Sequence, residues 1–261
     1  GIRDDLVTGV QTCALPICRM LERATWKKDR ALNWDRYDQW EIIARDVWKS
    51  RFVRWLTPVT EADQELKFVF QLKKDKAEMT YLNGPKTGHT IGIENGQPYE
   101  LLDDRRINKN SNKIRLYLAP VRDYFFWPQD LVNSKIVVYQ GEGKVNGEAY
   151  HKIFVTDGDF KPSRDEDQFI VWVNKKTMTI DFVEFTLREL LTSYRGVVEY
   201  VDYREVQGIR LPHRIILRDK IGDQKYSHEF LVDSMKFEKQ ERSLSFRMKI
   251  APLSQGIIFD L

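Results

Sequence analysis

The N-terminal part of the chain carries apolar residues at helical spacing. They recur three and four residues apart, which places them on one face of a helix: Trp40, Ile43, Ala44, Val47, Trp48, Phe52 and Trp55. Asn33 or Asp35 could cap the start of this helix, and Pro58 follows its end. The pattern predicts a helix within residues 20–56, although the part from about Asp46 also fits a strand.

From Glu65 onward the apolar period changes to two, which is typical of half-buried strands. The alternating apolar positions are Leu66, Phe68, Phe70 and Leu72, then Ala77, Met79 and Tyr81, then Ile91 and Ile93, and finally Tyr99 and Leu101. Asn95-Gly96 separates the last two runs. Because both residues of such a pair tolerate positive φ, the sequence predicts a tight hairpin there.

Residues 103–131 interrupt this alternation. Asp103–Lys113 is polar and basic and predicts a loop, and Ile114, Leu116 and Leu118 alternate as in another strand. Pro128 cannot donate a backbone hydrogen bond within a sheet. We therefore expect Pro120–Leu131 to form a short helix or a packed loop.

The second half predicts an almost continuous series of strands. Polar or glycine-bearing turns separate them, and such short connections favour antiparallel pairing of neighbours. The expected strands are 135–140, 148–156, 168–174, 178–187, 196–204, 210–218, 225–237 and 243–249. The fold class is mainly β (α+β): about 11–12 antiparallel strands in a curved half-barrel, packed on an N-terminal helix and one short helix.

A sheet of this width tends to curl, and its concave face must then be covered. One long helix covers only part of that face, so we expect a cavity beneath the sheet. Aromatic residues outside the helix are the candidates to line it and contact a ligand, with simple packing against the helix as the alternative for each: Phe125, Trp127, Phe169, Trp172 and Tyr200.

The first 17 residues read as a translated sequencing adapter. Val7–Ile17 corresponds codon by codon to a common library-primer sequence, and Gly1–Asp4 to the segment before its barcode. The alternative, a remnant of a signal peptide, lacks the sustained apolar run that such segments need. We therefore expect the natural start to be missing, and residues 18–261 to form a single β domain.

Composition limits the function further. The chain is 42% hydrophobic and 31% charged, as in globular domains, with a formal net charge of +3. Without Arg3, Asp4 and Asp5, 41 basic and 37 acidic residues remain, a charge of +4. No apolar run approaches the roughly twenty residues of a membrane span. There is no basic stripe or recognition motif, so we expect no nucleic-acid partner.

Motifs for catalysis or metal binding are missing. Cys13 lies in the adapter segment and Cys18 at its junction, and the four histidines follow no metal-binding spacing. His213, His228 and Asp202 could meet a zinc ion if their strands aligned, and the acidic loop 157–167 could hold calcium. Ordinary surface or hydrogen-bonded roles are favoured for the first group, and a solvated acidic loop for the second. Without a Gly-x-Ser-x-Gly or phosphate-binding motif, we expect no catalytic residue, no metal and no cofactor.

Three segments of the C-terminal half are similar to a known family: residues 167–177, 180–185 and 203–215, the last with a strand, a Gly turn and a strand entered through Leu-Pro. They resemble the LolA/LolB-like superfamily of periplasmic and outer-membrane lipoprotein carriers, and more closely the uncharacterised lipoproteins of Gram-negative bacteria with that fold. The resemblance implies a half-barrel over helices whose cavity holds acyl chains. It also implies export to the periplasm or outer membrane, where a lost lipid anchor would give peripheral membrane association. It assigns no ligand contact to a particular residue.

Pattern and resemblance together predict a non-enzymatic extracytoplasmic protein. Its expected partner is a hydrophobic small molecule, or the acyl chain of a lipid or lipoprotein, held on the concave face of the sheet. One alternative is a structural or interaction lipoprotein with a filled core. The other is a hydrolase with an unrecognised carboxylate or histidine site.

Overall fold

The computed structural model describes residues 20, 21, 24, 37–103, 105–161, 165–188 and 194–239. The adapter-like residues 1–17, most of the first half of the predicted helix and the predicted strand 243–249 lie outside these ranges.

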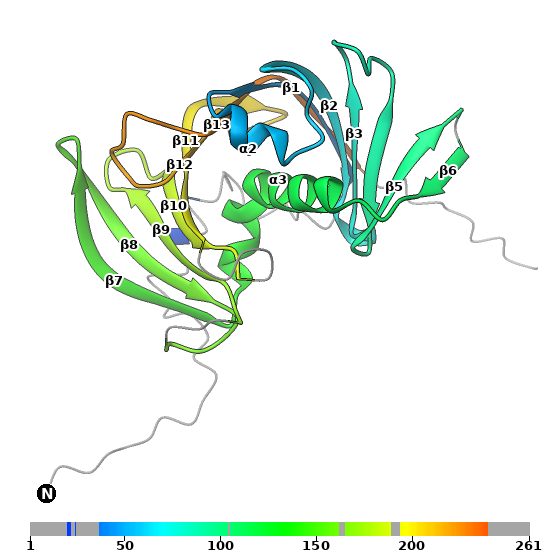
Figure 1. Cartoon of the computed structure of the whole chain (residues 1–261). Helices are drawn as coiled ribbons and strands as arrows, with labels where there is room; N and C mark the ends of the chain where they lie inside the picture. The colour runs from blue at the N-terminus through cyan, green and yellow to red at the C-terminus, as the bar shows by residue number, and fades with distance from the viewer. Residues whose placement is uncertain are drawn as a thin grey trace, which may run out of the picture.

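Within the described ranges, thirteen strands form one open antiparallel sheet that curves around a hollow (Figure 1). Their order is β6-β5-β4-β3-β2-β1-β13-β12-β11-β10-β9-β8-β7, so among these strands only the β1–β13 contact joins two that are distant in sequence. The predicted curved half-barrel is confirmed, with slightly more strands than expected. The strands are β1 (Tyr37–Trp48), β2 (Asp63–Gln71), β3 (Lys76–Tyr81), β4 (Thr90–Glu94), β5 (Gln97–Leu102), β6 (Arg105–Asn108), β7 (Ile136–Val145), β8 (Glu148–Thr156), β9 (Gln168–Asn174), β10 (Ile180–Thr186), β11 (Arg195–Val206), β12 (Ile209–Arg218) and β13 (His228–Lys239).

β1 lies at the centre of the sheet, where the sequence predicted the second half of a helix. It pairs with β13 on one side and β2 on the other, and its buried positions alternate from Trp40 to Trp48. The helix prediction is therefore wrong for residues 37–48, and the strand weighed as the alternative from about Asp46 is correct as far as Trp48. Trp40, Ala44 and Trp48 are four residues apart, which fits either period, and hydrogen bonding along both edges selects the strand. Helical backbone occurs upstream at Met20, Leu21 and Ala24, and downstream in the short helix α2 (Arg51–Trp55).

The turns of the sheet follow the predicted chemistry. Asn95 and Gly96 join β4 to β5 with φ of 48° and 71°, the left-handed values of a two-residue hairpin. Gln207 and Gly208 join β11 to β12 in the same way, with φ of 50° and 83°. The predicted meander of the second half is confirmed as far as β13.

The interruption between β6 and β7 is mostly one helix, α3 (Asn112–Asp130). The strand predicted through Ile114, Leu116 and Leu118 is wrong: Ile114 and Leu118 are buried one helical turn apart, and Leu116 is 40% exposed. The helix predicted for Pro120–Leu131 is confirmed as the second part of α3. The predicted loop before it contains β6. Short 3-10 turns η2 (Leu72–Lys74) and η3 (Leu131–Asn133) complete the elements.

α3 lies in the hollow because of the path of the chain. β6 and β7 form opposite edges of the sheet, and α3 connects them across the concave face (Figure 1). Its rings pack on both halves: Phe125 lies 6.0 Å from Phe68 of β2, and Trp127 lies 4.7 Å from Phe185 of β10, between ring centroids. One hydrophobic core therefore spans both halves of the sheet.

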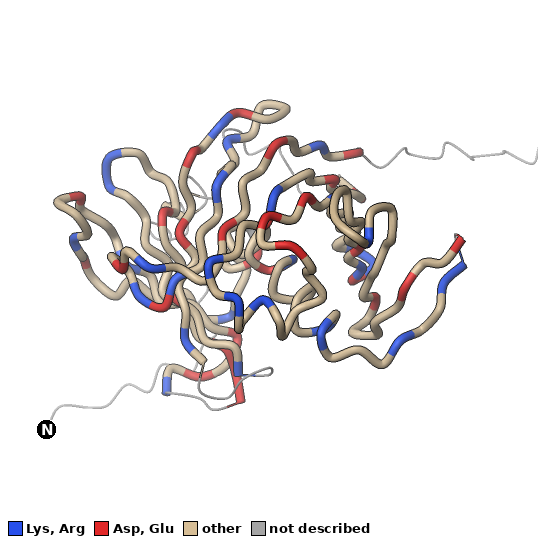
Figure 2. Tube along the Cα trace, turned by 45° about the horizontal axis from the view of Figure 1, so that its top comes forward, with Lys and Arg blue, Asp and Glu red and all other residues tan. Residues whose placement is uncertain are grey.

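Basic and acidic residues are interspersed over both halves of the sheet (Figure 2). In the part of the chain that the structure describes, no helix has the length and apolar character needed to cross a membrane.

Candidate functional site

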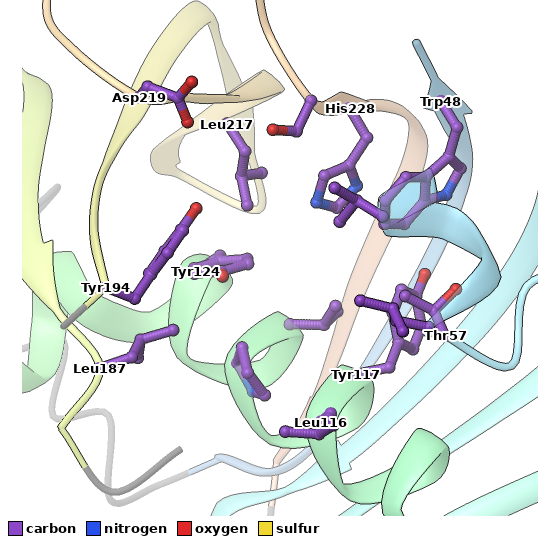
Figure 3. A pocket seen from close by; sticks show the side chains of 15 residues that line it. Trp48, Thr57, Leu116, Tyr117, Tyr124, Leu187, Tyr194, Leu217, Asp219 and His228 are labelled. Atoms are coloured by element: carbon purple, nitrogen blue, oxygen red, sulfur yellow. The ribbon is translucent and has the colours of Figure 1, made fainter. Parts of the chain in front are cut away.

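A cavity of about 260 Å³ lies between α2, α3 and the ends of β1, β12 and β13 (Figure 3). Its walls are mostly apolar, and a few polar groups gather on the side of β12 and β13. The lining residues are Trp48, Val53, Leu56, Thr57, Leu116, Tyr117, Pro120, Val121, Tyr124, Leu187, Tyr194, Leu217, Asp219, Ser227 and His228. A largely apolar hollow with a few polar groups is the usual form of a small-molecule site.

Helical spacing explains the wall that α3 contributes. Leu116, Pro120 and Tyr124 are four residues apart, so they lie above one another on one face. Tyr117 and Val121 form the adjacent row of that face. α2 closes the opposite side, where Val53 and Leu56 line the cavity.

A buried carboxylate lies behind the cavity. Asp46 is an inward-facing residue of β1 with no exposed surface. Its Oδ1 lies 2.7 Å from Nδ1 of His228, and its Oδ2 accepts from the Tyr117 hydroxyl at 2.5 Å. The indole of Trp48 stacks on the imidazole, with ring centroids 3.9 Å apart and planes at 9°. These contacts fix the position of the imidazole. The two hydrogen bonds also compensate for the burial of the carboxylate, which would be costly without such partners.

The imidazole of His228 is turned toward the cavity (Figure 3). A carboxylate only accepts hydrogen bonds, so Nδ1 carries the proton that it shares with Asp46. Nε2 has no hydrogen-bond partner among the described residues and is accessible from the cavity. The hydroxyls of Tyr124 and Tyr194 are likewise open and unpartnered within the described ranges. The cavity therefore contains three polar groups able to bind a ligand.

The tyrosines of the site remain protonated. Burial raises the pKa of the Tyr117 hydroxyl well above its usual value, and Asp46 raises it further. Burial also raises the pKa of Tyr124, and neighbouring Tyr194 adds to the shift. These phenols can donate and accept hydrogen bonds, and neither is activated as a base or nucleophile.

No family model matches the chain, and no curated protein matches it. Several solved structures match it. A DUF1329 family protein from Desulfovibrio piger is 11% identical with a TM-score of 0.51, covering 85% of this chain and 93% of that chain. A proposed outer membrane lipoprotein-sorting protein domain from Vibrio parahaemolyticus is 13% identical with a TM-score of 0.50, covering 85% and 94%. A LolA superfamily protein from Nitrosomonas europaea is 12% identical with a TM-score of 0.48, covering 86% and 94%.

The chain shares the fold of the lipoprotein-sorting domain and of the DUF1329 protein. The resemblance stated from the sequence is confirmed at the level of the fold, because the lipoprotein-sorting domain has the same architecture over most of both chains. Identities of 11–13% establish the fold alone.

The five aromatic residues predicted to contact ligand are absent from the set that lines this cavity. Phe125 is in the core, beside a void of about 10 Å³. Trp127 packs on Phe169 with ring centroids 5.2 Å apart, and the Tyr200 hydroxyl donates to the Tyr124 carbonyl at 2.7 Å. All four of these aromatics belong to the core around α3.

Trp172 lies on the opposite face of the sheet. It belongs to a separate cluster with Tyr150 and Phe182, and its Nε1 donates to Glu184 at 2.7 Å. For all five aromatics, direct ligand contact stays a prediction.

The zinc and calcium sites considered from the sequence do not form in the described ranges, where no three His, Cys, Asp or Glu side chains converge. His213 Nδ1 lies 3.1 Å from the Leu211 carbonyl oxygen, His228 binds Asp46, and Asp202 pairs with Arg204. In the acidic loop, Asp167 accepts from the backbone N–H of Arg188 at 2.6 Å. The hydrogen-bonded role favoured for the histidines therefore describes His213 and His228, although the sequence did not indicate Asp46 as the partner of His228.

Proposed function

We propose that this protein binds a hydrophobic ligand, the acyl chain of a lipid or lipoprotein, in the cavity between α2 and α3, and carries it without catalysing a reaction. The observation that carries this proposal is the cavity itself, about 260 Å³ with mostly apolar walls. The fold shared with a proposed lipoprotein-sorting domain supports the same class of ligand. It also supports a location outside the cytoplasm, in the periplasm or at the outer membrane.

The energetics of such binding are adequate. Removing a methylene group from water contributes about 0.8 kcal/mol, so a chain of about a dozen contributes on the order of 10 kcal/mol before the costs of ordering. Leu116, Val121 and Leu217 offer apolar contact along the walls. The concave side of the sheet therefore has both space and contact surface for an alkyl chain.

A hydrolase is less well supported by this site. The Asp46–His228 pair resembles the acid and base of a catalytic triad, which also needs a nucleophile within hydrogen-bond reach of Nε2. Among the described residues no hydroxyl makes that hydrogen bond, although Ser227 also lines the cavity.

The test is whether the protein contains or takes up lipid. The purified chain is extracted for mass spectrometry, and binding of an environment-sensitive fluorescent fatty acid is titrated. Leu116→Trp places a large ring at the rim of the cavity and should weaken probe binding about tenfold or more. Leu102→Trp is the control, because Leu102 is similarly exposed on β5 and does not line the cavity. Absence of both lipid and probe binding in the unmodified protein would contradict the proposal.

A further inference from the structure

We infer that the cavity selects an uncharged, hydroxyl-bearing amphiphile, such as an acylglycerol, and that His228, Tyr124 and Tyr194 hold its polar group. This inference rests on the proposed function and specifies the class of ligand.

The polar groups of the cavity have unused hydrogen-bonding capacity. His228 is 5% exposed, and Asp46 and Trp48 hold it rigidly. Its Nε2 still has no partner among the residues that the structure describes. Tyr124 is 6% exposed, and its hydroxyl is also open to the cavity. Groups this deeply buried are normally satisfied, so their open atoms indicate where the polar part of a ligand binds.

The charge of the lining also favours an uncharged ligand. The described lining residues include no lysine or arginine, and the one with a formal negative charge is Asp219. Asp219 makes no ion pair with any described residue. A carboxylate or phosphate head group would therefore approach an anionic wall with no fixed cation to neutralise it. This arrangement disfavours fatty-acid anions relative to uncharged lipids of the same chain.

The imidazole of His228 can both accept and donate a hydrogen bond. Nε2 accepts a hydrogen bond when the ring is neutral and donates one when the ring is protonated. A ligand hydroxyl can donate to the first form and accept from the second. The hydroxyls of Tyr124 and Tyr194 can adapt in the same way. A hydroxyl-bearing head group therefore satisfies the site in either protonation state.

The test compares two ligands that share one chain, monolauroylglycerol and laurate. Each displaces diphenylhexatriene, a fluorescent hydrocarbon without a head group, from the purified protein. We expect monolauroylglycerol to act at a concentration about fivefold or more below that of laurate, the effect of one or two net hydrogen bonds. Tyr124→Phe combined with Tyr194→Phe removes only hydroxyls and should abolish most of this preference. Diphenylhexatriene binding should persist.

A second variant tests the imidazole separately. His228→Asn places an amide N–H near the position of Nδ1, so Asp46 keeps a donor while Nε2 is lost. It should also reduce the preference, and Tyr139→Phe on exposed β7 serves as the control. Equal displacement by both lipids in the unmodified protein would overturn this inference and leave the proposed function standing. Failure to bind diphenylhexatriene or either lipid would overturn both.

A different observation carries a second inference: we propose that α2 docks on an anionic phospholipid bilayer. On this short helix Phe52 is 73% exposed and Trp55 is 67% exposed, beside Val53 and Leu56 at the edge of the cavity. Aromatic rings on a surface helix favour the boundary between lipid head groups and acyl chains. Docking would therefore place the opening of the cavity against the lipid.

The charges around α2 complement an anionic surface. Lys49, Arg51 and Arg54 lie beside the two aromatic residues in the sequence, which has no acidic residue between Asp46 and Glu61. Lys113 Nζ lies over the Trp55 ring, 5.1 Å from its centroid, and donates to the Trp55 carbonyl. None of the four basic residues makes an ion pair within the described part of the chain. Arg54 and Lys113 each donate one hydrogen bond to a backbone carbonyl, whereas Lys49 and Arg51 make no side-chain hydrogen bond with a described residue and can bind lipid phosphates.

Vesicle sedimentation tests this docking. Vesicles of phosphatidylcholine mixed with phosphatidylglycerol should bind the protein, and vesicles of phosphatidylcholine alone should bind it more weakly. Phe52→Ser combined with Trp55→Ser should weaken binding to the anionic vesicles about tenfold. Phe160→Ser is the control, since Phe160 is 59% exposed elsewhere. Binding that is unchanged by the α2 variant, or absent from anionic vesicles, would overturn the proposal.

Discussion

The charged residue Asp46 occupies a position where a strand would normally place an apolar side chain. It faces the core between Ala44 and Trp48 and has no exposed surface. A buried carboxylate destabilises the fold unless its oxygens receive strong hydrogen bonds. Tyr117 from α3 and His228 from β13 provide them, so one residue ties the helix to two strands.

Removing one of these donors should therefore destabilise the protein. Tyr117→Phe deletes the hydroxyl that donates to Asp46 and retains the ring. Since a hydrogen bond to a charged group contributes about 1.5–3 kcal/mol, the free energy of unfolding should fall by about that amount. Urea unfolding measures it, with Tyr139→Phe, which alters an exposed tyrosine, as the control. A loss equal to that of the control would show that Asp46 does not depend on Tyr117.

The pKa of a second carboxylate, that of Asp123, predicts how the stability of the protein varies with pH. Burial raises the pKa of Asp123 from 3.8 to about 6, although Arg122 pairs with it. Between these two values the folded state holds a proton that the unfolded state has lost, so stability decreases as pH rises through this window. Asp123→Asn should therefore unfold at higher urea concentration than the unmodified protein at about pH 8, and this advantage should shrink toward about pH 4. A constant difference across that range would contradict the prediction.

At the scale of elements, the incorrect assignments of β1 as a helix and of the start of α3 as a strand have a common physical cause. Trp40, Ala44 and Trp48 in β1 are four residues apart, and so are Ile114 and Leu118 in α3. Four residues correspond to about one helical turn and also to two strand repeats. For such runs the backbone hydrogen-bond partners decide between helix and strand. β1 bonds to strands on both sides, whereas the backbone of α3 bonds within the helix as it crosses the hollow. The clean alternation of β2 and the Asn95-Gly96 turn had no such ambiguity and were predicted correctly.

One strand pair offers a test of packing within the sheet. Gly92 of β4 lies opposite Tyr99 of β5, and a Cβ at Gly92 would lie 2.2 Å from the tyrosine ring. The ring is held in place by its hydrogen bond to Glu78 and by Arg106, which lies 4.1 Å above it. Gly92→Ala should therefore cost about 1–3 kcal/mol of stability through overpacking.

A double-mutant cycle isolates this contact. In a Tyr99→Ala background the space above Gly92 is free, so Gly92→Ala should be neutral or slightly stabilising, as expected for alanine inside a strand. Thermal and urea unfolding of the four proteins give the coupling energy. Additive effects of the two substitutions would mean that the glycine is not required by the ring.

At the scale of the whole molecule, the site depends on contacts that no local pattern reveals. The hydrogen bond between Asp46 and His228 joins residues 182 positions apart, and it exists because β1 pairs with β13. The sequence predicted a curved sheet and a cavity from strand number and turn chemistry. It could not predict the lining, because the path of α3 between β6 and β7 decides which side chains border the hollow. Four of the five predicted aromatics therefore belong to the core and Trp172 to a separate cluster, while Tyr117, Tyr124 and His228 line the cavity.

The same path of the chain predicts how the molecule unfolds. The sheet is continuous across β1 and β13, and α3 packs on both halves, so neither half has a separate core around the helix. We therefore expect one cooperative transition in urea, as for a single domain. Far-ultraviolet circular dichroism follows the sheet, and tryptophan fluorescence follows Trp40 and Trp48 in one half and Trp127 and Trp172 in or beside the other. The two curves should coincide, and an acylglycerol at about 100 times its Kd should shift both together by about 2.7 kcal/mol. Separate midpoints would show instead that the two halves of the sheet are independent units, and a cavity built from β1, α3, β12 and β13 could not then stabilise both.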